Sequence, residues 1–272
     1  MTDIRYVSMS DFQEELSVST VPTATDLVTV RLSSRDEFDE ATDLYRRVFG
    51  YQGEEFAINP MLMGGIVANG GSAVGVRDSA GTLVGFAYGF PGHTNGQLYH
   101  YSQAAVIEHG HQGKGIGRLL KFAQRDVALE NGMLEMRWAY DPFYARNGHF
   151  NLDSLGAVGW KFLPNYYGTP GSDRIIVRWD LEHPGAAHDA LPARPTPAIS
   201  SDQWGGIIRD RQTAWVPLPG NVTVDVKKYP EELQAVRASF MRSFGTLFGD
   251  GYQLRSCVRV DGETSAYRLE LS

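Results

Sequence analysis

The chain has 272 residues, of which 42% are hydrophobic and 21% are charged, a composition typical of a globular protein with a substantial core. The net charge of −7 argues against broad nucleic-acid binding, and no apolar run is long enough to cross a bilayer. The N-terminal residues lack the layout of a signal peptide, so we expect a cytoplasmic protein. The single cysteine, Cys257, excludes an intrachain disulfide and a thiolate metal cluster.

Apolar periodicity and turn residues predict the elements of the first half of the chain. Residues 1–25 are polar and irregular and are expected to form an arm. A capping box of Ser34 and Glu37 starts the first predicted helix, and Gly50 ends it. The further predictions are a strand at 27–32, a short helix at 59–71, a hairpin at 72–90 turning at 78–81, and a strand at 97–107.

The elements continue to residue 182 in an alternating pattern. A helix at 115–132 carries a predicted buried stripe of Ile116, Leu119, Leu120, Ala123 and Val127. A strand at 133–142, a short helix at 144–157 and two strands at 160–168 and 173–182 follow. The order β-α-α-β-β-β-α-β-α-β-β predicts an α/β (α+β) fold, in which a mixed, mostly antiparallel sheet is flanked by helices.

A proline-bearing stretch separates this predicted domain, residues 26–182, from a small C-terminal α+β subdomain. Residues 183–203 have little periodicity and are expected to form a linker before the subdomain at 204–272. We expect a strand at 221–226, a hairpin turning at Asp261–Gly262, and a helix at 230–249 with an apolar face of Leu233, Val236, Phe240, Phe244 and Leu247. One helix and one hairpin cannot bury that face alone, so the piece is expected to pack on the main domain or on a partner subunit of a homodimer.

The segment 109–120, HGHQGKGIGRLL, places three alternating glycines between a strand and a helix. The first amides of a helix lack partners and carry partial positive charge, so bare glycines there predict a phosphate-binding loop. A P-loop needs Lys and Ser or Thr after its last glycine, and a dinucleotide fingerprint needs a later Gly or Ala; neither spacing is met. The spacing that fits is Gln-x-x-Gly-x-Gly, formed by Gln112, Gly115 and Gly117.

On this motif, with its preceding strand and following helix, residues 26–180 resemble the GNAT N-acyltransferases. The segments around 138–157, 165–168 and 173–179 resemble a predicted branch that carries a C-terminal extension. The resemblance implies an acyl-CoA-dependent transferase moving an acetyl or succinyl-like group to the amine of a small molecule such as an amino acid, with no metal. The implied coenzyme A contacts are Ala105, Val106, Gln112, Gly113, Lys114, Gly115, Ile116, Gly117, Arg118 and Asn147. Lys114 either lies near a phosphate or is a solvated loop lysine.

Acyl transfer to an amine needs a base, donors for the oxyanion and an acid for the leaving thiolate. The family's usual acid, a tyrosine, is absent, because its aligned position is Leu152. Tyr144 is our candidate for the acid. The other candidates are Tyr166, Tyr167 and His149.

For the base we consider His100 and Tyr101, which are neighbours on one strand, so only one of them faces the site. The alternative for His100 is a buried histidine satisfied by hydrogen bonds. Glu108 either acts near the site or caps the loop, and Asp141 either orients an amine or caps a turn. Glu135 and Arg137 share a strand face and either pair with each other or line the site. A protein that binds acyl-CoA without catalysis is the competing functional hypothesis.

Overall fold

The computed structural model describes residues 27–51, 58–186, 196–222 and 230–271. Contacts divide the chain into two compact units, Met1–Met136 and Arg137–Ser272. The predicted arm at 1–25 lies outside the described residues, as do most of the predicted strand at 221–226 and the middle of the predicted linker. The predicted domain boundaries at 182 and 203 stay predictions, because this division by contacts does not test them.

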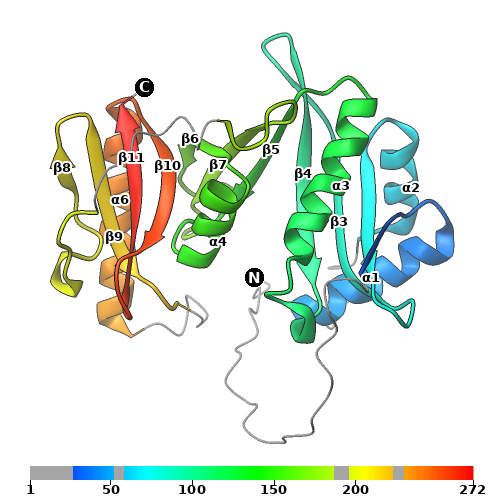
Figure 1. The fold of residues 1–272 in the computed structure, drawn as a ribbon, viewed down its shortest axis with the longest axis horizontal. Helices are drawn as coiled ribbons and strands as arrows, with labels where there is room; N and C mark the ends of the chain where they lie inside the picture. The colour runs from blue at the N-terminus through cyan, green and yellow to red at the C-terminus, as the bar shows by residue number, and fades with distance from the viewer. Residues whose placement is uncertain (1–26, 52–57, 187–195, 223–229, 272) are drawn as a thin grey trace, which may run out of the picture. The chain divides into compact units, whose positions relative to one another are not determined.

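The first unit is a sheet in the order β1-β2-β3-β4 with helices on both faces (Figure 1). Adjacent strands are antiparallel, and the hairpin joins Ser72 to Gly89 and Arg77 to Leu83. The elements are β1 (Val28–Arg31), α1 (Arg35–Phe49), α2 (Pro60–Ala68), β2 (Ser72–Arg77), β3 (Leu83–Thr94), β4 (Gln97–Ile107) and α3 (Ile116–Glu130).

Alternation along the strands gives this sheet two apolar faces. One face carries Ala73 and Phe86 and packs against α1 and α2 through Phe38 and Met63. The opposite face packs against α3; its cluster is Val74, Val76, Val84, Ala87, Ile116, Leu120 and Val127. The sheet is therefore buried on both sides, which explains why β2 is buried along almost its whole length.

The predicted ends of α1 are confirmed. Ser34 accepts a hydrogen bond from the Glu37 amide while the Glu37 side chain accepts from the Ser34 amide. Gly50 closes the helix in the left-handed conformation at φ 65°. The predicted stripe of α3 is wrong at Leu119, which is exposed. The buried polar residues Lys121 and Gln124 lie on the sheet-facing side of α3 instead.

The second unit is a sheet in the order β5-β7-β6-β10-β11-β9-β8 with helices α4 and α6. Its elements are β5 (Glu135–Tyr140, which begins at the unit boundary), α4 (Ala145–His149), the π-helical turn η4 (Phe150–Ser154), β6 (Val158–Leu163), β7 (Arg174–Asp180), the turn η5 (Ser201–Gln203), β8 (Ile208–Asp210), β9 (Thr213–Pro219), α6 (Glu231–Gly249), β10 (Tyr252–Arg259) and β11 (Thr264–Leu271). The predicted hairpin turning at Asp261–Gly262 is confirmed as β10 and β11.

From β1 to β7 the elements follow the predicted order. The mostly antiparallel sheet flanked by helices is confirmed, and this element order is that of the GNAT fold that the resemblance implied.

The apolar face of α6 is covered by the same chain. Phe240 and Phe244 are fully buried, and both rings contact Tyr267 of β11. Phe240 also contacts Phe143, which precedes α4. Phe244 contacts Phe162, which lies on β6. Strand β10 joins β6 through the pair Leu254 and Gly159. The C-terminal strands and α6 therefore share one sheet and one core with β6 and α4.

Strand β9 was not predicted, because its sequence TAWVPLP contains two prolines, which cannot donate to a ladder. β9 pairs along its length with β11, but β8 pairs only as far as Trp215. Beyond Trp215 no strand of the described chain pairs with β9 on that side, and Pro217 is bonded there only as an acceptor, from the Gly205 amide, so the amide that proline lacks is not required. Besides the predicted helix and hairpin, the described part of the subdomain therefore contains β8 and β9, which were not expected, while most of the predicted strand at 221–226 lies outside the described residues.

Replacing Phe240 by alanine should reduce the free energy of unfolding by about 3–5 kcal/mol, because it opens a cavity among the rings of Phe143, Phe244 and Tyr267. Leu233→Ala, at a half-buried position of the same helix, is the matched control and should cost far less. Urea denaturation of both variants measures this. Equal losses would contradict the view that this aromatic cluster holds α6 in place.

Candidate functional site

The glycine loop leads from a single turn at His109–His111 into the first turn of α3. Gly115 is the N-cap residue at φ 81° and ψ −2°, a left-handed conformation that a residue with a side chain adopts only with strain. Its carbonyl accepts from the amides of Arg118 and Leu119. In the described part of the chain, the amides of residues 113–117 donate to no backbone carbonyl outside the helix, so they are open to an external acceptor.

The start of α3 differs from the starts of the other long helices. α1 has a serine cap with Asp36 and Glu37 in its first turn, and α6 has Glu231 and Glu232. α3 has no side-chain cap and no acidic residue in its first turn. Its positive end is therefore not compensated by its own first turn, an arrangement suited to an anion.

The other predicted coenzyme A residues occupy varied positions. Ala105 and Val106 lie on β4 opposite Ala87 and Phe86, after a bulge at Gln103. Ile116 is buried in the α3 core and contributes its amide alone, whereas Arg118 is exposed with its guanidinium over the Phe122 ring. Gln112, Gly113, Lys114 and Gly117 lie in or beside the loop, and Asn147 is exposed in α4 of the second unit. The contacts assigned to all of these residues stay predictions.

His100 is completely buried, and its Nε2 lies 2.9 Å from Ser72 Oγ. Burial and the nearby charge of Lys121 lower the pKa of His100 to about 4, so it is neutral at pH 7. This geometry favours the alternative of a structural histidine over a catalytic base. The sequence could not distinguish a structural histidine from a catalytic base. The residues around His100 show only the alternation of a strand, which does not tell which face of β4 is buried.

A buried polar network, which the sequence did not predict, surrounds His100. Lys121 Nζ donates to Ser102 Oγ at 2.8 Å, and Ser102 donates to Gln124 Oε1 at 2.8 Å. Gln124 Nε2 donates to Ser72 Oγ at 3.1 Å, which leaves the Ser72 proton for His100 Nε2. Burial lowers the pKa of Lys121 to about 7. The one feature of the sequence that could have indicated this network is the pair of polar residues, Lys121 and Gln124, on the apolar side of the predicted helix.

The tyrosine candidates lie in three places. Tyr101 is half-buried, with its ring 5.5 Å from that of Phe90. Tyr144 is the half-buried N-cap residue of α4, and its carbonyl accepts from the amides of Asn147 and Gly148. Tyr166 and Tyr167 stack edge to face in the loop between β6 and β7. These positions do not identify which tyrosine is the acid, and the assignment of Tyr144 stays a prediction.

The remaining acid and base candidates are engaged in the structure. Glu108 forms an ion pair with Arg47 at 2.9 Å. Asp141 accepts from the Phe143 amide and from both terminal nitrogens of Arg237, at 3.1 and 3.0 Å, which favours the turn-capping alternative. His149 Nδ1 lies 3.1 Å from the Cys257 carbonyl. Burial raises the pKa of the Cys257 thiol, which argues against a nucleophilic role.

Within the described residues, no three His, Cys, Asp or Glu side chains gather closely enough to hold a metal ion. No helix in the same residues has both the length and the apolar character needed to cross a membrane.

Comparison with known proteins finds structural likeness without sequence relatives. No protein-family model matches the sequence, and no curated protein matches it. Among solved structures, yncA from Salmonella typhimurium, with acetyl-CoA as its cofactor, is 19% identical and matches 61% of this chain and 99% of its own, with a TM-score of 0.47. The Escherichia coli ribosomal-protein-S18-alanine N-acetyltransferase is 15% identical over 57% of this chain and 94% of its own, with a TM-score of 0.44.

A chain of the NatC complex bound to Gag peptide and CoA is 16% identical and matches 57% of this chain and 98% of its own, with a TM-score of 0.46. With TM-scores below 0.5, these likenesses leave the function to be argued from the residues of this chain.

The lowered pKa of Lys121 predicts how stability depends on pH. Between pH 7 and 10.5 the unfolded chain binds more protons than the folded protein, so the free energy of unfolding rises with pH by up to about 1.4 kcal/mol per unit. Lys121→Met should remove this rise, whereas Lys161→Met, at an exposed position, should keep it. Urea denaturation at pH 7, 8 and 9 tests the difference, and identical slopes in both variants would exclude Lys121 as its source.

Proposed function

We propose that this chain is an acyl-CoA-dependent N-acyltransferase that moves an acetyl or succinyl-like group to the amine of a small molecule. The observation that carries the proposal is the start of α3: a glycine N-cap, open amides at 113–117 and no acidic residue in the first turn. Such a helix end is suited to the diphosphate of coenzyme A. The Gln112-x-x-Gly115-x-Gly117 spacing and the order of elements from β1 to β7 support the same conclusion.

In this proposal the residues of the chain divide the chemistry among them. The loop amides hold the diphosphate, and a backbone amide near Ala105 or Val106 donates to the oxyanion of the tetrahedral intermediate. As the amine nitrogen bonds to the carbonyl carbon and the carbon–sulfur bond breaks, a base takes the ammonium proton. An acid returns a proton to the leaving thiolate, and Tyr144 is our candidate for it.

The second candidate function is an acyl-CoA-binding protein without turnover. The observation that favours it is Leu152, which occupies the position of the usual tyrosine and is fully buried, so it supplies no proton donor. Release of free thiol from acetyl-CoA and succinyl-CoA with a panel of amines separates the two candidates, because only an enzyme releases coenzyme A in proportion to the amine.

Gly117→Val should weaken coenzyme A binding at least about tenfold, because the added side chain obstructs the approach of the diphosphate to the first turn of α3 and removes contacts with the amides. The matched control is Gly65→Val in α2, where an added carbon meets nothing within 4 Å. Calorimetric titration of both folded variants with coenzyme A measures the effect. An unchanged affinity for Gly117→Val would remove the loop from the site.

Tyr144→Phe should lower kcat about tenfold or more with little change in the KM for acyl-CoA, because the phenol would act on the leaving group and not in binding. Tyr45→Phe, at a half-buried tyrosine of α1 that is not a candidate for the acid, is the control. A kcat and pH–rate profile that Tyr144→Phe leaves unaltered would eliminate Tyr144 and direct attention to Tyr166, Tyr167 or direct protonation by solvent.

A further inference from the structure

One side of the second unit's sheet carries a row of basic side chains, which we call the arginine face. Its basic residues are Arg137 on β5, Arg178 on β7, Lys161 on β6, Arg255 on β10 and Arg268 on β11. The aromatic residue Trp160 of β6 lies among them. These five strands are consecutive neighbours in the sheet. The opposite side carries Trp179 and Tyr267, which pack toward η4, α4 and α6. Because side chains alternate along a strand, Arg178 and Arg268 face away from those helices.

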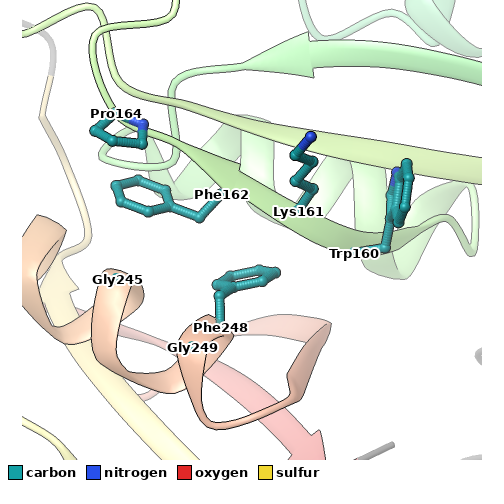
Figure 2. Close-up of a pocket in the computed structure, with 7 residues that line it drawn as sticks. All are labelled: Trp160, Lys161, Phe162, Pro164, Gly245, Phe248 and Gly249. Carbon is teal, nitrogen blue, oxygen red and sulfur yellow. The ribbon is translucent and has the colours of Figure 1, made fainter.

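Two bulges bring further residues to this face. The register of β6 shifts between Gly159 and Lys161 against β7, so Trp160 and Lys161 share one side. Figure 2 shows the Trp160 and Lys161 side chains projecting from β6 on the side away from Phe248; both residues also line the hollow beside α6, together with Phe162 and Phe248. The register of β10 shifts in the same way at Arg255, between Leu254 and Ser256.

Trp160 is the centre of the arginine face. The guanidinium carbon of Arg137 lies 5.3 Å from its ring centroid and that of Arg178 lies 5.9 Å from it. Arg178 is also close enough to Arg255 to act on its charge. The pKa of Arg255 is lowered, first by burial and also by repulsion from Arg178.

Glu135, Asp180 and Glu270 lie on or near this face, and within the described residues none of them forms an ion pair with Arg178 or Arg255. Glu270 accepts a hydrogen bond from Arg268, and Asp180 accepts from the amides of residues 182 and 183 in the following turn. At Arg255 the largest influence on the pKa is burial, followed by the attraction of Glu270, which raises the pKa, and then by the repulsion from Arg178, which lowers it. Within the described chain, Arg178 and Arg255 form no ion pair, and two buried donors, Arg255 Nε and Trp160 Nε1, have no hydrogen-bond acceptor.

Buried donors without acceptors and adjacent like charges are both unfavourable, and a bound anion would relieve both at once. We propose that the arginine face is a binding site for the carboxylate or phosphate group of a small molecule, held by Arg178 and Arg255 beside Trp160. Arginine suits this role because its planar fork donates two hydrogen bonds to either group. The inference concerns binding alone and stands whether or not the chain transfers acyl groups.

The test titrates the full chain, without acyl-CoA, with succinate and separately with inorganic phosphate, by calorimetry and by tryptophan fluorescence. We expect saturable binding of at least one probe, weakened about tenfold in Arg178→Gln and in Arg255→Gln, since each loses a charge-assisted hydrogen bond. Arg178→Lys should recover part of the affinity. The fluorescence change should vanish in Trp160→Phe. The matched control is Arg242→Gln, which removes the same charge from an exposed position of α6 and should bind as the unmodified protein does.

Arg178 is exposed, so its variant is expected to fold even if the half-buried Arg255 variant does not. Coenzyme A lacking its thiol, added as a competitor, identifies the source of the anion. Competition would mean that the face holds a cofactor phosphate, and its absence would mean a separate small anion; both outcomes support the site. Failure of both probes to saturate, or equal loss of affinity in Arg242→Gln and Arg178→Gln, would overturn the proposal.

Discussion

A buried chain of hydrogen bonds fixes α3 to the sheet of the first unit, and the proposed diphosphate loop depends on it. From Lys121 through Ser102, Gln124 and Ser72 to His100, each donor serves the next acceptor, so one direction satisfies every step. His100 fits beside β3 only because position 89 is glycine, where an added carbon would lie 2.5 Å from its Nε2. Breaking any one link would leave a buried polar group without its partner, which makes the arrangement of α3 on β2 and β4 specific.

Because α3 is a continuous helix, the contacts that fix its middle also fix its first turn and the loop before it. Lys121 and Gln124 lie about 1.7 and 2.5 turns beyond the glycine N-cap, so the contacts that hold them also set where the first amides point. Ile116, buried in the α3 core, fixes the same turn from its other end. A loop with three glycines has little rigidity of its own, and the packing of the helix that follows supplies what the loop lacks. The positions of the loop amides in the proposed site thus depend on the packing of α3 in the core of the first unit.

The sequence predicted the features that depend on neighbouring residues, such as helix caps and turns. It missed the features that depend on contacts between segments far apart in the chain. The ends of α1 and the hairpin at 261–262 were found because Ser34, Gly50 and Gly262 leave a local signature. β9 was missed because its two prolines are tolerated only where β8 stops pairing, and nothing near them in the sequence records that. The stripe of α3 was misjudged at Leu119 because the partners of Lys121 lie on β4, far away in the chain. The loop spacing was readable from the sequence, whereas no residue pattern identified the acid of the proposed reaction.

The same reasoning explains why the arginine face was invisible in the sequence. In regular strands Lys161 and Arg255 would follow the alternation of their neighbours, but two single-residue bulges in adjacent strands reset it and bring Trp160 and Lys161 to one side. The bulge in β10 leaves the Arg255 guanidinium half-buried with its Nε lacking an acceptor among the described residues, which is unfavourable unless a ligand supplies one. Natural sheets keep such features where they re-aim side chains toward a task. One bulge places Trp160 beside Arg137 and Arg178, and the other places Arg255 within reach of the Arg178 charge, an arrangement that we interpret as a binding surface.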